Sequence, residues 1–321
     1  MSPFKSNLPS AAAISAVLDA LAYQYCEFST HALPATYSNF THRINAELKD
    51  GSCKRIVLRR YNPANYEDGH DKARCEFHAL KLLKKAGIPA PPPLLLDETG
   101  ELLGLPGIVT GYVKGAPIEP PTEAKRWGEL ADANARMLAR IHQTPFSEAD
   151  KRYLMNDNVE VAWFIKDGRI PDYMRADPDG EMVWQLVNER WGRWTPVEPR
   201  FAHTDYWSGN ILWHGDQISA VVDWEEAGYG HPAADVAYAR MEYFLEGLPE
   251  AAETFLRAYE AEAGWRLSDL ALFELAACAR PMTDPSGWFT RPHMEARFRR
   301  FIAGANERLF APHPPAPSAA S

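Results

Sequence analysis

This chain of 321 residues has few cysteines, fewer basic than acidic residues and no long apolar run. Its four cysteines, Cys26, Cys53, Cys75 and Cys278, lack the paired spacing of a metal site, so we expect reduced thiols in a cytoplasmic protein. The net charge of −9, from 34 basic and 43 acidic residues, argues against a nucleic-acid partner. No apolar run approaches the ~18 residues that span a bilayer, so we expect no membrane partner.

Tryptophan is missing from the first part of the chain, since all ten tryptophans lie at or beyond Trp127. The pattern also changes there. Residues 36–61 alternate as strands do around the turn "KDGS", and "DKARCEFHALKLLKKAG" predicts a helix that ends at Gly87. Most of the chain after residue 145 is typical of helices and loops. The sequence therefore predicts an α+β protein with a boundary near residues 112–118.

We predict three segments from this change of pattern. Residues 1–112 form an N-terminal lobe with an N-terminal helix, an antiparallel sheet and one main helix. Residues 113–310 form a larger, mostly helical lobe. Residues 311–321, "APHPPAPSAAS", lack large apolar side chains, so we expect a disordered tail.

The stretch "FAHTDYWSGNILW" places His203, Asp205 and Asn210 at fixed offsets, and "VVDWEEAG" then carries Asp223 at the end of an apolar run. The turn "HGDQ" between two apolar runs predicts a hairpin that brings Asn210 close to Asp223. Oxygen ligands suit Mg²⁺, and a further carboxylate can accept the proton of an attacking hydroxyl. The pattern therefore favours magnesium-assisted phosphoryl transfer.

These motifs resemble those of the aminoglycoside phosphotransferase and choline kinase-like enzymes, whose fold is that of protein kinases. The catalytic loop H-x-D-x-x-x-x-N of that family is matched by "HTDYWSGN", its metal-binding segment by "DWE" and its G-[DH]-P-x-x-D segment by "GHPAAD". The three occur in the family's order with short gaps, and their combination is specific. The resemblance implies a two-lobed kinase-like fold and an enzyme that uses ATP and Mg²⁺.

The resemblance also implies a role for each polar residue of the motifs. Asp205 is expected to be the catalytic base, and Asn210 and Asp223 the Mg²⁺ ligands. Asp235 is expected to accept hydrogen bonds from the backbone of the catalytic loop. His203 is expected to support that loop structurally.

The N-terminal lobe is expected to supply the grip on the nucleotide phosphates. Family members carry a Leu-Lys or Leu-Arg strand end that pairs with a glutamate on the next helix, and "RIVLRR" offers Arg59. Glu76 lies on the same helical face as Ala73, Leu80 and Leu83. A carboxylate on such an apolar face needs a partner, so we predict an ion pair between Glu76 and Arg59.

The first hairpin, "YSNFTHRI", contains no glycine, whereas protein kinases cover the phosphates with a glycine-rich loop. Ser38, Asn39 and Thr41 are therefore the expected donors to the phosphates, as "S-N-x-T" is in similar proteins. The alternative is a plain polar hairpin.

The adenine pocket is expected between a strand and the segment "GIVTGYVKG", which resembles the family's hinge. Val57 shares a strand face with the phosphate-gripping arginine, so it can line this pocket. Backbone groups of Thr110, Tyr112 and Val113 are expected to bind the adenine edge.

The acceptor is expected to be a small molecule with a hydroxyl group, an aminosugar, a sugar or an amino-alcohol, and possibly cationic. Trp207 lies inside the catalytic loop, where an aromatic face can hold an amine or a sugar. Glu225, Glu226 and Asp284 are candidates for contact with an amine, although solvated carboxylates are the alternative for all three.

Two other functions stay open. The missing glycines favour a nucleotide-binding pseudokinase without activity, against which the intact catalytic motifs argue. His203, Asp205, His214, Asp223 and His231 could instead form a metal-dependent hydrolase site, but such a site needs several converging imidazoles and His214 falls in the predicted turn.

Overall fold

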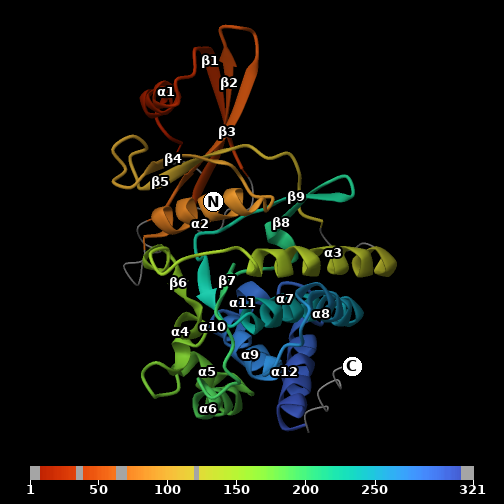
Figure 1. The fold of residues 1–321 in the computed structure, drawn as a ribbon. Coiled ribbons are helices and arrows are strands. Elements are labelled where there is room, and N and C mark those ends of the chain that lie inside the picture. The colour runs from red at the N-terminus through yellow and green to blue at the C-terminus, as the bar shows by residue number, and fades with distance from the viewer. Residues whose placement is uncertain (1–7, 34–38, 63–70, 119–122, 312–321) are drawn as a thin grey trace. The chain divides into compact units, whose positions relative to one another are not determined.

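A computed structural model describes residues 8–33, 39–62, 71–118 and 123–311 of the chain (Figure 1). The chain divides into two compact units, and each is assembled from segments that are not consecutive in the sequence. Unit 1 comprises the described parts of Met1–Glu119, Gln143–Met155 and Ser208–Tyr229, and unit 2 those of Pro120–His142, Asn156–Trp207 and Gly230–Ser321. The sequence analysis placed a single division between residues 112 and 113, whereas two later segments also join unit 1.

Unit 1 contains a five-stranded antiparallel sheet with the strand order β1-β2-β3-β5-β4 (Figure 1). Its strands are β1 (Tyr25–Ala32), β2 (Phe40–Leu48), β3 (Cys53–Arg60), β4 (Pro93–Asp97) and β5 (Gly107–Gly111). In β3 the side chains alternate, so that Ile56 and Leu58 are buried in the core while Val57 and Arg59 lie together on the opposite face. The period-two pattern therefore sets which face of the sheet carries the polar groups.

Two helices belong to unit 1, α1 (Ala11–Ala20) and α2 (Lys72–Ala86). Ile14 and Val17 of α1 pack into the apolar core of the sheet. In α2 the side chain of Asp71 caps the first turn, and Gly87 ends the helix in a left-handed conformation with φ 70°. The predicted end of this helix is confirmed.

A second, two-stranded sheet in unit 1 is formed by β8 (Ile211–His214) and β9 (Gln217–Val221). This is the predicted hairpin. Trp213 exchanges backbone hydrogen bonds with Ala116 at 2.8 and 3.1 Å, and the Val221 N–H donates to the Pro89 carbonyl at 2.9 Å. These bonds attach the hairpin to the first segment of unit 1.

Unit 2 is mostly helical. Its helices are α3 (Ala124–His142), α4 (Asp157–Glu160), α5 (Asp172–Ala176), α6 (Gly180–Arg190), α7 (Ala233–Leu245), α8 (Pro249–Ala263), α9 (Leu270–Ala277), α10 (Ala279–Thr283), α11 (Pro285–Trp288) and α12 (Met294–Phe310). Short elements elsewhere are η3 (Lys151–Tyr153), η4 (Trp163–Ile165), η5 (Ser208–Asn210), β6 (Met155–Asn156), β7 (Arg200–Ala202) and β10 (Gly228–Gly230).

Helix α7 is the central helix of unit 2, because it packs against α8, α9 and α12 (Figure 1). Nearly all of its side chains are buried, including Arg240, whose guanidinium pairs with the buried carboxylate of Glu274 at 2.7 Å. Within the described residues, every helix is too short or too polar to cross a lipid bilayer. The four cysteines are free thiols.

Candidate active site

The hairpin of unit 1 brings the backbones of the two predicted metal ligands together. Ile211 pairs with Val221, and the next residue outward, Val222, donates its N–H to the carbonyl of Asn210 at 2.9 Å. Asp223 follows directly, with a positive φ of 70° that is uncommon for a residue with a side chain. Backbone strain of this kind concentrates at functional sites.

Arg59 lies within reach of three carboxylates of unit 1. Its Nη2 atom is 2.5 Å from Asp223 Oδ1 and 2.6 Å from Glu225 Oε2, and its Nε is 3.3 Å from Glu76 Oε2. Burial alone would lower the pKa of Arg59, but the charges of Asp223, Glu76 and Glu225 outweigh it and raise that pKa well above its usual value. The predicted Arg59–Glu76 ion pair is therefore present, and it is part of a larger cluster.

Glu76 is buried on the apolar face of α2, together with Ala73, Leu80 and Leu83. Burial raises the pKa of Glu76 to about 7, with Arg59 opposing the shift. The hydroxyl of Tyr61 donates a hydrogen bond to the same carboxylate. Near pH 7 the charged and the neutral forms of Glu76 are therefore both populated.

The polar residues of the first hairpin share the sheet face of Arg59. Thr41 stands opposite Arg59 in the β2–β3 register, and its buried hydroxyl has no hydrogen-bond partner among the described residues. The amide of Asn39 donates to Glu225, and its carbonyl oxygen accepts from the Asn62 N–H at 3.2 Å. Ser38 falls outside the described residues.

The segment predicted as a hinge follows β5. Thr110 is buried and stands opposite Val57 in the β3–β5 register. Tyr112 donates its backbone N–H to the Arg55 carbonyl at 3.1 Å, and Val113 beyond it is half-buried. Val57 and Thr110 are therefore neighbours on the sheet face that carries Arg59.

Glu225 and Glu226, which the sequence analysis assigned to the acceptor, are engaged by cations of unit 1. Lys72 Nζ lies 2.9 Å from Glu226 Oε1 and 3.4 Å from Glu225 Oε1, and Arg59 also contacts Glu225. Sequence reasoning missed Lys72, whose only signal is its place as the first residue of α2. The geometry groups both glutamates with Arg59 and Lys72.

In unit 2 the predicted catalytic loop is held by Asp235. Its buried carboxylate accepts the backbone N–H groups of His203 at 2.8 Å and Thr204 at 2.7 Å, and it contacts His142 Nε2 at 3.1 Å. Burial would raise the pKa of Asp235, but its hydrogen bonds to His142 and the loop outweigh burial and lower it. Thr204, the residue before Asp205, also has a positive φ of 70°.

The side chain of Asp205 contacts two residues that the motifs did not indicate. Arg280 of α10 places Nη1 3.0 Å from Asp205 Oδ1 and donates from Nη2 to the Thr204 carbonyl at 2.7 Å. Tyr238 of α7 lies close to Asp205, whose charge, after burial, raises the pKa of Tyr238 well above its usual value, and Glu242 is one turn later on α7. Burial, and then the charge of Asp205, raises the pKa of Glu242 to about 8. At neutral pH this glutamate is therefore mainly uncharged.

The other two predicted acceptor residues lie in unit 2. Trp207 is half-buried and packs against the large apolar core cluster of that unit. Asp284 caps α11 by accepting hydrogen bonds from the Gly287 N–H at 3.1 Å and the Ser286 hydroxyl at 2.8 Å. Asp284 is therefore already engaged in a helix cap.

Two of the histidines that the hydrolase alternative requires, His231 and His214, belong to different units. His231 is buried, stacks on Phe273 with a ring distance of 4.4 Å and accepts the Ala233 N–H at 3.1 Å. His214 is exposed at the end of β8. The described residues contain no group of three or more His, Cys, Asp or Glu side chains arranged to hold a metal ion.

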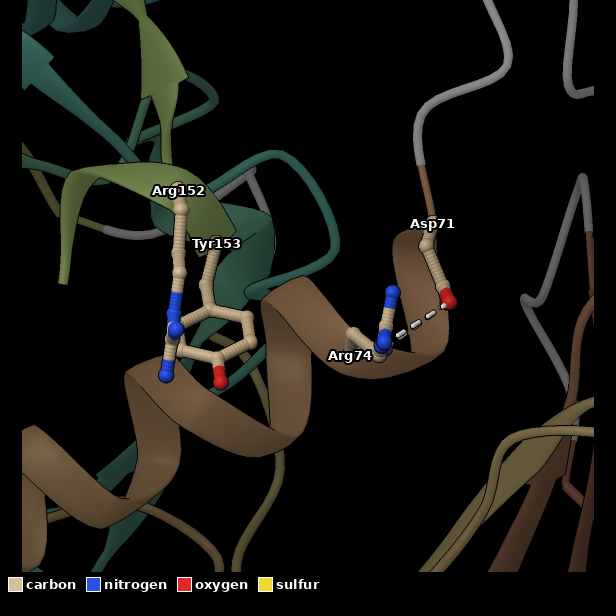
Figure 2. Close-up of a pocket in the computed structure, with 4 residues that line it drawn as sticks. All are labelled: Asp71, Arg74, Arg152 and Tyr153. Atoms are coloured by element: carbon tan, nitrogen blue, oxygen red, sulfur yellow. Dashed lines mark hydrogen bonds and ion pairs between the residues drawn. The ribbon is translucent and has the colours of Figure 1, made fainter. Parts of the chain in front are cut away.

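A surface pocket of about 290 Å³ elsewhere in unit 1 is lined by Asp71, Arg74, Arg152 and Tyr153. Figure 2 shows Arg74 turned toward Asp71, with Nε 3.5 Å from the carboxylate, and Arg152 lying alongside the ring of Tyr153. The pocket contains none of the predicted site residues. Because the predicted site residues lie elsewhere, we do not assign this pocket to the active site.

Residues 38–270, well over half of the chain, match the sequence profile of the phosphotransferase enzyme family. The chain belongs to this family. The solved structure of choline kinase LicA from Streptococcus pneumoniae is similar, with a TM-score of 0.59 and 17% identity, over 92% of this chain and 98% of that one. The family resemblance and the α+β, protein-kinase-like fold predicted from the sequence are therefore confirmed.

Two further proteins are similar to this chain. Aminoglycoside phosphotransferase APH(4)-Ia, in a ternary complex with AMP-PNP and hygromycin B, has a TM-score of 0.61 and 15% identity over 92% of this chain and 98% of that one. Acyl-CoA dehydrogenase family member 10 of Mus musculus is 27% identical over 204 residues, which are 60% of this chain and 19% of that protein. The chain thus spans about a fifth of the length of this curated relative.

Proposed function

We propose that this phosphotransferase is a small-molecule kinase that transfers the γ-phosphoryl group of ATP to a hydroxyl group with the help of Mg²⁺. One observation carries the proposal. Arg59, the expected phosphate-gripping cation, and Asp223, the expected metal ligand, lie 2.5 Å apart although 164 residues separate them in the sequence. A fold that joins these two groups is suited to hold the phosphates and a metal together.

The donor set of the hairpin fits Mg²⁺. Asn210 offers an amide oxygen and Asp223 a carboxylate, and Mg²⁺ commonly takes one or two protein ligands and fills its other positions with phosphate oxygens and water. When bound, the ion would neutralise charge on the β- and γ-phosphates. Arg59 would then turn its fork of N–H donors from Asp223 to the phosphate oxygens.

The nucleotide would lie along the sheet face that carries Arg59. The buried hydroxyl of Thr41, which has no hydrogen-bond partner within the part of the chain that the structure describes, supports this placement, because such a group is costly unless a ligand completes it. Asn39 and Ser38 would add donors to the phosphates. Val57 and the backbone of Thr110, and of Tyr112 and Val113 beyond it, would contact the adenine. Glu76 and Glu225 would keep Arg59 in place.

Asp205 would accept the proton of the attacking hydroxyl. Its loop is fixed by Asp235, which accepts the N–H groups of His203 and Thr204. A base held in this way loses little orientational freedom at the moment of reaction. Trp207, two residues later, is the aromatic side chain proposed to contact the acceptor.

The proposal is tested by product formation. The chain should consume ATP only when Mg²⁺ and a suitable alcohol are present, and mass spectrometry should find the acceptor heavier by one phosphoryl group. The panel should contain sugars, aminosugars, amino-alcohols and hydroxy acids. Asp205→Asn should lower turnover by ~10²–10⁴, while Asp216→Asn, an exposed control in the hairpin turn, should not. Binding of ATP without transfer to any alcohol would instead support the pseudokinase.

A further inference from the structure

A guanidinium group occupies the surroundings of the proposed base. Arg280 pairs with Asp205 at 3.0 Å and with the Thr204 carbonyl at 2.7 Å, and its charged group lies over the Tyr238 ring at 4.5 Å. Its side chain keeps 25% of its surface exposed and that of Asp205 keeps 30%. The ion pair is therefore accessible from solvent.

Two other acidic residues on α7 and at its end, Glu242 and Glu246, add little negative charge near this ion pair. Glu242 has a raised pKa of about 8, caused first by burial, and is mainly neutral at pH 7. Glu246, on the turn after it, forms an ion pair with Arg291. The charge of Asp205 is thus matched by that of Arg280. A cationic acceptor would meet a guanidinium there without a surplus of carboxylates.

A small cavity adjoins Arg280. Its lining includes Trp163, Tyr238 and Ala276, which are largely apolar, together with Thr204. Arg280 is the one charged residue among the described residues that line it. With a volume of about 10 Å³ it has room for about one water molecule, so the acceptor itself would lie on the solvent-exposed side of the ion pair.

We propose that the acceptor is an alcohol that also carries a carboxylate, and that Arg280 binds this carboxylate beside Asp205. The inference rests on the proposed function, since it names the acceptor class of the same reaction. A planar guanidinium suits the recognition of a carboxylate. This class replaces the cationic acceptor expected from the sequence.

The chemical step is balanced without a further reactant. The acceptor oxygen forms a bond to the γ-phosphorus, the bond between that phosphorus and the β,γ-bridging oxygen of ATP breaks, and the hydroxyl proton passes to Asp205. Arg280 takes no part in these bond changes. It positions the acceptor through its carboxylate and is a specificity-determining residue.

The experiment compares matched acceptors. Hydroxy acids of two to six carbons are each paired with their primary amide and with the amino-alcohol of the same length. With ATP and Mg²⁺, the acid should have a kcat/KM roughly ten- to a hundredfold above its amide, the range expected for a charged hydrogen bond. The amino-alcohol should be the poorest of the three. Equal use of acid and amide, or a preference for the amino-alcohol, overturns the proposal and leaves the kinase assignment standing.

Variants separate recognition from folding. Arg280→Gln should bring the ratio of kcat/KM for the acid to that for the amide close to one, whereas Arg280→Lys should keep part of the preference. Arg175→Gln, exposed on α5, is the matched control and should resemble the wild type. An acid preference that persists in Arg280→Gln overturns the proposal. Should that variant unfold, the Arg280→Lys preference decides, because an unchanged acid-to-amide ratio there also overturns it.

Calorimetry distinguishes failure of the function from failure of the inference. The hydroxy acids are titrated into the protein with a non-hydrolysable ATP analogue and Mg²⁺. Binding of an acid that Arg280→Gln or Arg280→Lys weakens, without phosphorylation of any alcohol, would contradict the kinase and support acid recognition. Absence of both binding and turnover with every acid would overturn the proposal.

Discussion

Two buried carboxylates of this protein, Glu76 in unit 1 and Asp235 in unit 2, are shifted in opposite directions by their surroundings. Glu76 lies on an apolar helix face and shares one guanidinium with Asp223 and Glu225, so burial dominates and its pKa rises to about 7. Asp235 accepts two backbone N–H groups and contacts His142, so its pKa falls despite burial. Both carboxylates are buried, so the difference between their pKa values comes from the hydrogen bonds to Asp235 and from the neighbouring carboxylates that raise the pKa of Glu76.

The contrast fits two different tasks. Asp235 fixes a loop whose shape must not change, and it is fully satisfied within its own unit. The Arg59 cluster has three carboxylates around one guanidinium, an arrangement that a phosphate and a metal ion would rearrange. Asp235 is thus a support within unit 2, whereas the carboxylates around Arg59 in unit 1 fit the proposed ligand grip.

Removing the Asp235 carboxylate should have the largest effect on stability. Asp235→Ala leaves two buried N–H groups and His142 without their acceptor, so the free energy of unfolding should fall by about 3–5 kcal/mol. Denaturant titration measures this loss. Asp269→Ala, at the partly exposed start of α9, is a control that should cost much less. A loss below about 1 kcal/mol for Asp235→Ala would mean that the loop does not depend on this carboxylate.

The pH dependence of Asp235 follows from its lowered pKa. The folded state then binds the proton less readily than the unfolded state, so the stabilisation is present above the unfolded pKa of about 4 and is lost as the pH falls through the lower folded value. Asp235→Asn should therefore flatten the acid side of the stability profile. An acid limb as steep as that of the wild type would contradict this assignment.

Substitution of Arg59 should have an intermediate effect, seen in the kinetics. Arg59→Ala removes the phosphate grip and should raise the KM for ATP roughly tenfold to a hundredfold, the range of a charged hydrogen bond. Arg59→Lys keeps the charge without the fork and should lose less. Arg55→Ala, exposed on the same strand, serves as the control. If both Arg59 variants bind and use ATP as the wild type does, the grip lies elsewhere.

Glu76 should give the smallest effect and one of opposite sign to Asp235. Its raised pKa means that the folded state binds the proton more readily than the unfolded state. The associated stabilisation is full below about pH 4.3 and is lost as the pH rises to about 7. Glu76→Gln should make the stability profile shallower across this window. Exposed Glu101→Gln should leave it unchanged, and a Glu76→Gln profile as steep as the wild type's would count against the shift.

Much of the fold and the local part of the site could be predicted from the sequence. The helix ending at Gly87 and the hairpin between Asn210 and Asp223 are set by turn residues and apolar runs that lie close together in the chain. The apolar helix face indicates that Glu76 needs a partner, and the family resemblance implies that this partner is Arg59. Short-range patterns carry this information directly.

The remaining contacts depend on packing that a single sequence does not encode locally. Arg280 reaches Asp205 across 75 residues, because α10 packs within the helices of unit 2. Glu225 and Glu226 face Lys72 across more than 150 residues, because the hairpin joins the first segment of unit 1. The assembly of each unit from separate segments likewise depends on packing between residues that are far apart in the sequence. The acceptor residues were consequently the least predictable part of the site.

The most direct test of the account is calorimetric titration of a non-hydrolysable ATP analogue with and without Mg²⁺. In the wild type and in Asp205→Asn, Mg²⁺ should strengthen binding to the same extent, because the base does not hold the nucleotide. In Asp223→Asn the magnesium dependence should largely disappear. Binding without Mg²⁺ should be kept, because Arg59, which lies 2.5 Å from the Asp223 carboxylate in the wild type, stays available for the phosphates. Full magnesium dependence in Asp223→Asn, or its loss in Asp205→Asn, would contradict the assignment of the metal and the base to these residues.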